Sequence, residues 1–304
     1  MKDLTKNNVL LENIVDQKTT SGIDQVIPDF DRVLYHVSTP ESKTKMLVSI
    51  KIDCFESLMK YDLQSVLERY YHGFIVSPEE KYNFSLYIDL EKIAEDEKEK
   101  KDLVRSIGLL KRNILSAPFE KAFCLQQLLE EQKNEQDTKN THKEIIKIPY
   151  RDEEAIFIIP SSDRVTVIFS MIFKEETDII LGKEFVDARK RPAIQNAPQV
   201  FYSYRDPPLE IQTLCDLKSS DNIGYVTFVL FPQHYTPQKK EDCIAKIQLF
   251  RNMLYYHIKA SKVHMHERMR ARVAQFLKVL NRAKLENTEK AKKTASGRSF
   301  NVSK

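Results

Sequence analysis

Glycine is scarce in this sequence, with only 6 glycines among 304 residues, against an average of about 7%. They stand alone at positions 22, 73, 108, 182, 224 and 297. No G-x-G-x-x-G fingerprint, Walker loop or G-x-S-x-G nucleophile elbow can be formed from isolated glycines. This scarcity excludes most nucleotide-binding enzymes and the α/β-hydrolases.

Cysteine pairs are also missing. The four cysteines, at positions 54, 124, 215 and 243, form no C-x-x-C motif, so zinc ribbons and thioredoxin-like sites are not supported. We expect free, buried thiols in a reducing compartment. The N-terminus has no apolar signal-peptide core, and no stretch approaches the roughly 20 apolar residues of a membrane span. The sequence therefore predicts a cytoplasmic protein without a transmembrane segment.

The histidines and acidic residues are not spaced as metal ligands or catalytic groups would be. No H-E-x-x-H motif exists; His264 and His266 point to opposite sides of a helix, and His257 is two turns from His264. Glu153 and Glu154 are neighbours at the start of a predicted strand, where alternation sends them to opposite faces. No nucleophile has an adjacent base. We therefore predict no catalytic residues, no metal site, no cofactor and no enzymatic activity.

What is present is a charged, globular chain with 41% hydrophobic and 30% charged residues. Its net charge of +4 names no partner. The distribution is more informative, because the segment from Lys259 to Lys284 holds eight Lys/Arg and one acid, Glu267. This segment carries +7, so the rest of the chain is net negative at −3.

The order of predicted elements indicates two similar halves. In each half, strands are followed by a helix, further strands and a long helix. Short turns between strands favour antiparallel sheets with helices packed on them. The fold class is therefore α+β: two similar α/β sandwich-like domains followed by a long C-terminal helix. We expect a lead-in at 1–28, domains at 29–129 and 145–237, a polar linker at 130–144, the long helix at 238–287 and a tail at 288–304.

The C-terminal helix is the most informative element. From Gln238 to Ser296 there is no proline or glycine, and about 45 helical residues would span roughly 65–70 Å. A domain of about 100 residues has a radius of gyration of only about 13 Å. We therefore expect the helix to run past the domain that precedes it.

An apolar stripe follows one face of this helix, formed by Leu254, Ile258, Met265, Met269, Phe276 and Leu280. Their spacings of 4, 7, 4, 7 and 4 residues are the period that keeps a stripe straight. Residues 243–258 of it can pack on the protein's own sheet, whereas the remainder would form an exposed apolar patch. We predict a subunit interface, with another long helix as partner, at Leu254, Ile258, Met265, Met269, Val273, Phe276 and Leu280.

Basic residues flank this stripe on both sides: Lys259, Arg270 and Lys284 on one, and Arg268, Lys278 and Arg282 on the other. Such a cluster is suited to an acidic surface. Actin, nucleic acid and anionic membrane are all acidic, and charge does not choose among them. A nucleic-acid reader usually adds a recognisable module, and none is found in the sequence.

Several stretches resemble the subunit 2 family of the actin-related protein 2/3 (Arp2/3) complex. They are Phe30–His36, Asp163–Val167, Ala197–Val200, Arg205–Glu210, Asp221–Pro232, Tyr256–Lys259, Arg268–Ala271 and Phe276–Ala283. The similarity is strongest from Tyr150 onward. Residues 1–28 match poorly, the linker is longer and more polar, Asp206 replaces an expected Glu, and Pro118 interrupts a helix.

The resemblance implies a non-catalytic scaffold subunit of a seven-subunit actin nucleator in the cortical actin cytoskeleton. Subunit 2 would pair with subunit 4 through the long C-terminal helices and hold the side of the pre-existing actin filament, while the two actin-related subunits bind ATP and template a branch. The six basic residues above would then bind the filament. The alternative is an adaptor whose basic helix binds an anionic membrane or nucleic acid.

Overall fold

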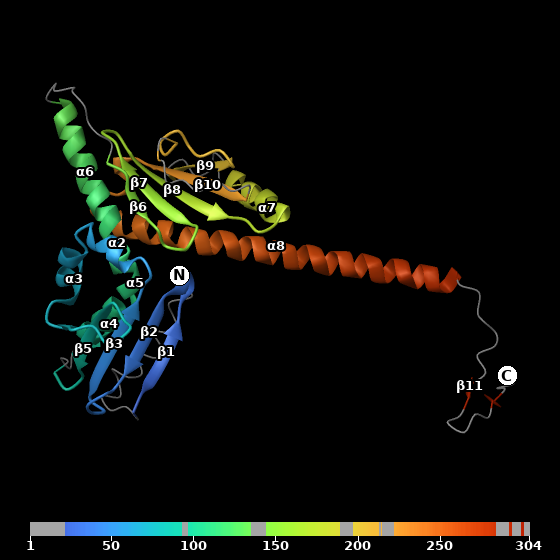
Figure 1. The fold of residues 1–304 in the computed structure, drawn as a ribbon, viewed down its shortest axis with the longest axis horizontal. Helices are drawn as coiled ribbons and strands as arrows, with labels where there is room; N and C mark the ends of the chain where they lie inside the picture. The colour runs from blue at the N-terminus through green and yellow to red at the C-terminus, as the bar shows by residue number, and fades with distance from the viewer. Residues whose placement is uncertain are drawn as a thin grey trace. The chain divides into compact units, whose positions relative to one another are not determined.

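The computed structural model describes residues 22–92, 97–134, 144–188, 197–212, 214, 222–283, 292–293 and 299–300. The chain divides into two compact units, Met1–Tyr255 and Tyr256–Lys304. The first unit contains two five-stranded sheets and the helices that pack on them (Figure 1). In the second unit, the two-residue strands β11 (Lys292–Lys293) and β12 (Ser299–Phe300) pair with each other.

The first sheet is antiparallel, with strand order β1-β2-β3-β5-β4. Its strands are β1 (Asp24–Pro28), β2 (Leu34–Ser38), β3 (Lys45–Lys51), β4 (Ile75–Val76) and β5 (Phe84–Asp89). The helical segments of this half are η1 (Phe30–Arg32), α2 (Phe55–Met59), α3 (Leu63–Tyr71), α4 (Glu97–Gly108) and α5 (Leu110–Ile114).

The core of this half forms where alternate apolar residues of the strands meet the helices. Met46, Val48 and Ile50 of β3 are buried at every second position, as expected for one face of a strand. The ring of Tyr71, at the end of α3, packs 6.3 Å from that of Phe84 in β5. Its buried hydroxyl donates to the Ser106 carbonyl and accepts from the Asn113 amide, so it is satisfied.

The second sheet repeats this topology, with strand order β6-β7-β8-β10-β9. Its strands are β6 (Ile146–Ile148), β7 (Ala155–Pro160), β8 (Val165–Ile172), β9 (Gln199–Tyr204) and β10 (Ile223–Leu230). Helices α6 (Ala117–Asn134), α7 (Glu176–Asp187) and α8 (Lys240–Ala283) accompany it, with the short turn η2 (Pro232–His234) before α8. The matching strand orders confirm the predicted α+β fold of two similar halves.

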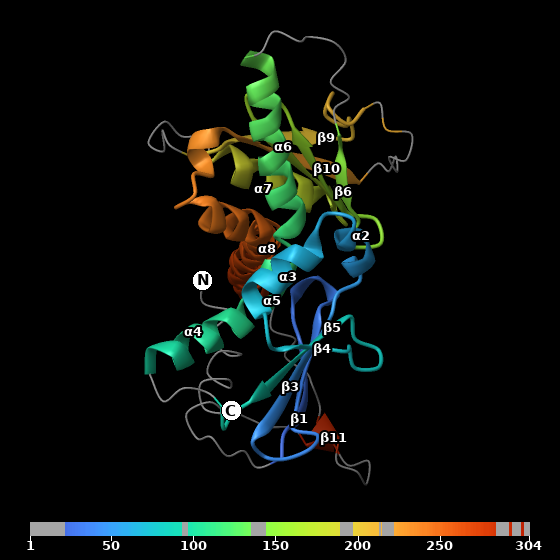
Figure 2. The same ribbon diagram turned by 90° about the vertical axis from the view of Figure 1, so that its left-hand side faces the viewer.

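Both faces of the second sheet are covered, so every residue of β7 and β10 is buried. On one face, Phe250 of α8 packs against Phe169 of β8, Phe228 of β10 and Phe185 of α7. Helix α6 lies across the sheet on β7 and β8 (Figure 2). The other face is covered around Ile211, in the segment that follows β9.

Three local features differ from the sequence expectations or refine them. Residues 24–28, placed in the loose lead-in, form strand β1, because pairing with β2 supplies order that its polar sequence does not indicate. Pro118 lies at the start of α6, a position that needs no N–H donor. Cys54 and Cys243 are free and buried, and burial raises their pKa values to about 12 and about 11, but Cys124 is exposed. Cys215 and most of the predicted linker lie outside the described residues.

A histidine clamp holds β1 to the first sheet. The Nε2 atom of His36 lies 2.8 Å from Asp24 Oδ1 in β1, and Nδ1 lies 2.8 Å from Glu79 Oε2 in the turn before β5. The ring also stacks on Tyr82. Burial lowers the pKa of His36, but the two carboxylates outweigh this and raise it above its ordinary value of 6.5. Both ring nitrogens can donate at once only in the protonated ring.

We expect the chain to lose stability as pH rises from about 6.5 through the raised pKa of His36. The stabilisation is complete below the unfolded-state pKa and disappears when the folded-state proton is released. Urea unfolding from pH 5.5 to 8.5 measures this, with His36→Gln as the control that removes the titration. If the free energy of unfolding of His36→Gln falls with pH as steeply as that of the unaltered chain, the assignment to His36 is contradicted.

Candidate binding surface on the C-terminal helix

Helix α8 runs from Lys240 to Ala283, 44 residues, or about 66 Å at 1.5 Å per residue. It begins after Pro237, where the N–H groups of Lys239 and Lys240 donate to the Thr236 carbonyl. Glu241 and Asp242 occupy the first turn, favourable for the helix dipole. The part of the predicted helix beyond Ala283 lies outside the described residues.

Burial along α8 changes partway through the helix. Cys243, Ile244, Ile247, Phe250 and Leu254 are buried, which gives the first half a packed face. In contrast, every residue from Val263 to Ala283 is exposed. The second half of the helix therefore has no apolar cover from the described part of the chain.

The predicted interface residues divide accordingly. Leu254 and Ile258 are 0% and 2% exposed, so they belong to the chain's own core and are not available to a partner. Periodicity could not separate them from the rest of the stripe, because a helix face keeps the same spacing whatever covers it. The other predicted residues, 41–62% exposed, are Met265, Met269, Val273, Phe276 and Leu280.

The exposed apolar surface is also wider than predicted. Leu277 and Val279 are exposed as well. Leu277 is four residues after Val273, and Val279 is three after Phe276, so both lie beside the predicted stripe. This spacing was the signal in the sequence that could have identified them.

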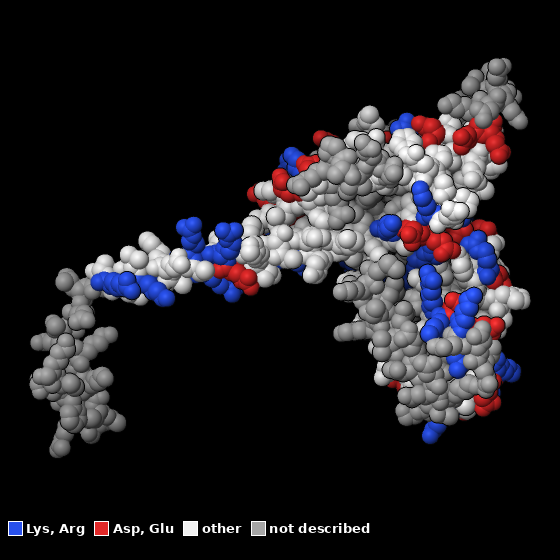
Figure 3. Space-filling view, turned by 180° about the vertical axis from the view of Figure 1, so that it is seen from behind, with Lys and Arg blue, Asp and Glu red and all other residues white. Residues whose placement is uncertain are grey.

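The predicted basic residues of α8 are exposed. Figure 3 shows Lys and Arg at several places along the helix, with neutral surface between them. The exposed ones from the prediction are Lys259, Arg268, Arg270, Lys278 and Arg282, while Lys284 lies outside the described residues. Residues 256–283 carry seven Lys/Arg and one acid, so this part of the helix combines an apolar stripe with a strongly positive charge.

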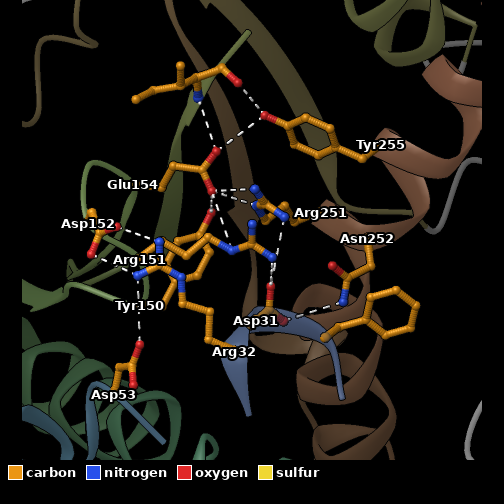
Figure 4. A network of polar contacts seen from close by, with 12 residues as sticks. Asp31, Arg32, Asp53, Tyr150, Arg151, Asp152, Glu154, Arg251, Asn252 and Tyr255 are labelled. Atoms are coloured by element: carbon orange, nitrogen blue, oxygen red, sulfur yellow. Dashed lines mark hydrogen bonds and ion pairs between the residues drawn. The ribbon is translucent and has the colours of Figure 1, made fainter. Parts of the chain in front are cut away.

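A buried polar network joins the first half of α8 to both sheets (Figure 4). Its centre is the ion pair between Arg251 of α8 and Glu154, which precedes β7; the two residues are 7% and 6% exposed. Arg251 Nε donates to Glu154 Oε2 over 2.7 Å, and a second guanidinium nitrogen lies 2.5 Å from the same oxygen. The guanidinium also lies 4.4 Å from the Tyr255 ring centroid.

The remaining acceptor positions of Glu154 are used as well. Its Oε1 atom accepts from the Ile172 backbone N–H, and its Oε2 atom from the Tyr150 hydroxyl, each over 3.2 Å. The Tyr255 hydroxyl lies within reach of Glu154 Oε1 and of the Ile172 carbonyl. A buried carboxylate with this many donors is fully compensated. Sequence reasoning set Glu154 aside, because only the fold brings Arg251 to it.

Asp31 is the network's acid on the side of the first sheet. It lies in η1 with a left-handed backbone, φ 65°, and its Oδ1 atom accepts from Arg151 over 2.9 Å. Burial raises its pKa, but Lys111, Arg151 and Arg251 outweigh this and lower it overall. Asp31 therefore stays ionised and faces cations from α5, the β6–β7 loop and α8 together.

The exposed surface of α8 is suited to binding a partner, and the buried polar network is suited to holding the fold together. Among the described residues, no cluster of three or more His, Cys, Asp and Glu side chains could hold a metal ion. In the same part of the chain, no helix has the length and apolar composition to cross a membrane.

Comparison with known proteins agrees with the motifs in the sequence. The family model described as "Arp2/3 complex, 34 kD subunit p34-Arc" matches residues 48–287. The curated "Actin-related protein 2/3 complex subunit 2" of Schizosaccharomyces pombe is 50% identical over 99% of both chains. The protein of the same name from Dictyostelium discoideum is 34% identical over 97% of both. The resemblance is thus confirmed, and the chain belongs to the p34-Arc family of Arp2/3 complex subunits.

Proposed function

We propose that this chain is a non-catalytic scaffold subunit of an Arp2/3 complex in the cytoplasm, at cortical actin structures. Its role is to pair with subunit 4 and to hold the side of a pre-existing actin filament while the two actin-related subunits start a branch. The near full-length similarity to two proteins named as subunit 2 of that complex supports this role. The chain itself requires no cofactor for it.

One observation carries the proposal: five large apolar residues of the predicted interface are exposed on the second half of α8. Fully burying a side chain of this size contributes about 1.5–3 kcal/mol. A continuous stripe of them is a sizeable apolar patch, which marks a protein interface in soluble proteins. We assign this stripe to the long C-terminal helix of subunit 4, because a straight stripe fits a partner helix along its length.

The basic residues beside the stripe are assigned to the filament. Actin is acidic, and a filament presents many equivalent copies of the same surface. Exposed charge pairs contribute about 0.2–1 kcal/mol each, so several of them give a moderate, salt-sensitive affinity. Such contacts permit loading onto the filament side, while the apolar stripe keeps the chain in its complex.

We also keep the domain division as a proposal. Residues 29–129 and 145–237 would form the two α/β domains, joined by a linker at 130–144, with the binding helix at 238–287 and a lead-in and tail at the ends. The location of four strands of the first sheet in 29–129, and of all five strands of the second in 145–237, supports it. The boundary at 129 needs correction, because α6 (Ala117–Asn134) runs into the predicted linker and packs on β7 and β8 of the second sheet.

A triple charge reversal tests the filament assignment. Arg270→Glu, Lys278→Glu and Arg282→Glu together should weaken filament binding of the assembled complex about tenfold or more near 0.1 M salt, measured by co-sedimentation. The complex should still assemble, because the apolar stripe is unchanged.

The matched control applies the same charge change to exposed lysines of the first unit, as Lys51→Glu, Lys60→Glu and Lys183→Glu, and should bind filaments normally. Unchanged affinity in the α8 variant would remove the proposed filament site. Saturable binding of the unaltered chain to anionic vesicles or nucleic acid at physiological salt, with no filament binding, would favour the adaptor role instead.

A further inference from the structure

We propose that Arg251 is a positioning residue that fixes the two sheets relative to each other by joining both to helix α8. The proposal rests on geometry: Arg251 Nε lies 2.7 Å from Glu154 Oε2 on the side of the second sheet, and Arg251 Nη1 lies 3.8 Å from Asp31 Oδ1 on the side of the first. A single buried guanidinium from α8 therefore faces one carboxylate from each half of the first unit.

The neighbours of Arg251 on α8 reinforce this arrangement. Asn252 Nδ2 lies 3.4 Å from Asp31 Oδ2, and the Tyr255 hydroxyl reaches Glu154 and the Ile172 carbonyl at the end of β8. One turn of α8 thus contacts η1, the residue before β7, and the end of β8 (Figure 4). A rotation or shift of the helix would break contacts to both sheets together.

Other polar links also join the two halves: Arg151 donates to Asp31 over 2.9 Å, and Glu120 of α6 accepts from Arg69 of α3 over 2.7 Å. The links that lie outside these clusters are more exposed or longer. The Arg32–Asp152 pair is close, at 2.5 Å, but its side chains are 55% and 70% exposed, where water and salt weaken an ion pair. The Tyr61 hydroxyl donates to the Lys147 carbonyl over 3.3 Å. Polar interfaces between domains permit relative motion by default. The Arg251–Glu154 pair is buried and directional, so it can hold one orientation more firmly than exposed pairs can.

The usefulness of a fixed orientation rests on the proposed scaffold function, but the test needs no partner. Nitroxide labels at Lys60→Cys after α2 and Lys183→Cys in α7 report the distance between the two halves by pulsed electron spin resonance. The full-length chain carries Cys124→Ser and Cys215→Ser, while the buried Cys54 and Cys243 remain. The unaltered network should give one narrow distance distribution.

Arg251→Met, which keeps bulk but removes charge and donors, should broaden that distribution at least twofold. The width for Arg251→Lys should lie between those of the unaltered chain and Arg251→Met, because lysine keeps the charge but cannot make the two parallel contacts of a guanidinium. The matched control is Ile247→Ala, a buried position on the same helix. It should lower the thermal midpoint without broadening the distribution, which separates positioning from loss of stability.

Equal widths for Arg251→Met and Ile247→Ala would overturn the proposal. If Arg251→Met does not fold, Asp31→Asn decides the question, because it removes the carboxylate through which Arg251 reaches the first sheet. Arg151→Met serves as its control, since Asp31 also accepts from Arg151, and should broaden the distribution less than Asp31→Asn. A narrow distribution in Asp31→Asn, unchanged from the parent, would then overturn it. None of these outcomes depends on complex assembly or filament binding. A result that overturns the role of Arg251 therefore does not contradict the proposed function, which the filament-binding experiment tests separately.

Discussion

Replacing Phe276 and Leu280 by aspartate should abolish recovery of the chain in an Arp2/3 complex while leaving its own unfolding unchanged. Both side chains are exposed in the chain, so aspartate there removes no core packing. In the proposed interface, each change loses about 1.5–3 kcal/mol of apolar burial and places a carboxylate against an apolar partner. Together, we expect an affinity loss of about a thousandfold or more.

A tagged pull-down from native lysate measures this, with recovery of two actin-related proteins and four smaller subunits as the reference result. The control carries the same chemical change at exposed apolar residues of other helices, Leu128→Asp in α6 and Ile180→Asp in α7, and should recover the complex. Full recovery with the α8 variant would show that the distal stripe is not the subunit interface. Recovery of the unaltered chain alone, soluble and monodisperse, would contradict the scaffold proposal.

Glu154→Gln should lower the free energy of unfolding by about 3–5 kcal/mol, the range for removing one partner of a buried ion pair. The glutamine occupies the same volume, so no cavity contributes. The loss arises because Arg251 remains buried without its closest carboxylate, and Asp31 at 3.8 Å compensates it only in part. Urea unfolding at pH 7 measures the difference, provided that the m-values of the two proteins are equal.

Asp152→Asn is the matched control, because Asp152 makes two short contacts to Arg32 but lies in solvent. We expect a loss of about 0.2–1 kcal/mol there, as for exposed ion pairs in general. Similar losses in the two variants would mean that burial does not decide the strength of these pairs, and the network would lose its assigned importance.

Local patterns predicted much of the fold. Short runs rich in branched and aromatic residues favoured strands at β3, β7, β8 and β10. The absence of proline and glycine after Gln238 predicted a long helix, which the structure shows over 44 residues. These signals are readable because the side-chain period of a strand or helix is a property of the local chain. Strand β1 was not predicted, because its order comes from pairing with β2 and from the contact between Asp24 and His36.

The sequence by itself thus determined the family, the α+β class and the apolar and basic character of the last helix, because motifs, spacing and charge lie in consecutive residues. Only the tertiary structure decided where along that helix burial ends, placing Leu254 and Ile258 in the core and leaving Phe276 exposed. It alone joined Arg251 to Glu154, 97 residues away, and Asn252 to Asp31, 221 residues away. Such pairs follow from topology, which no local period encodes, because burial and electrostatic compensation depend on what the rest of the chain brings alongside.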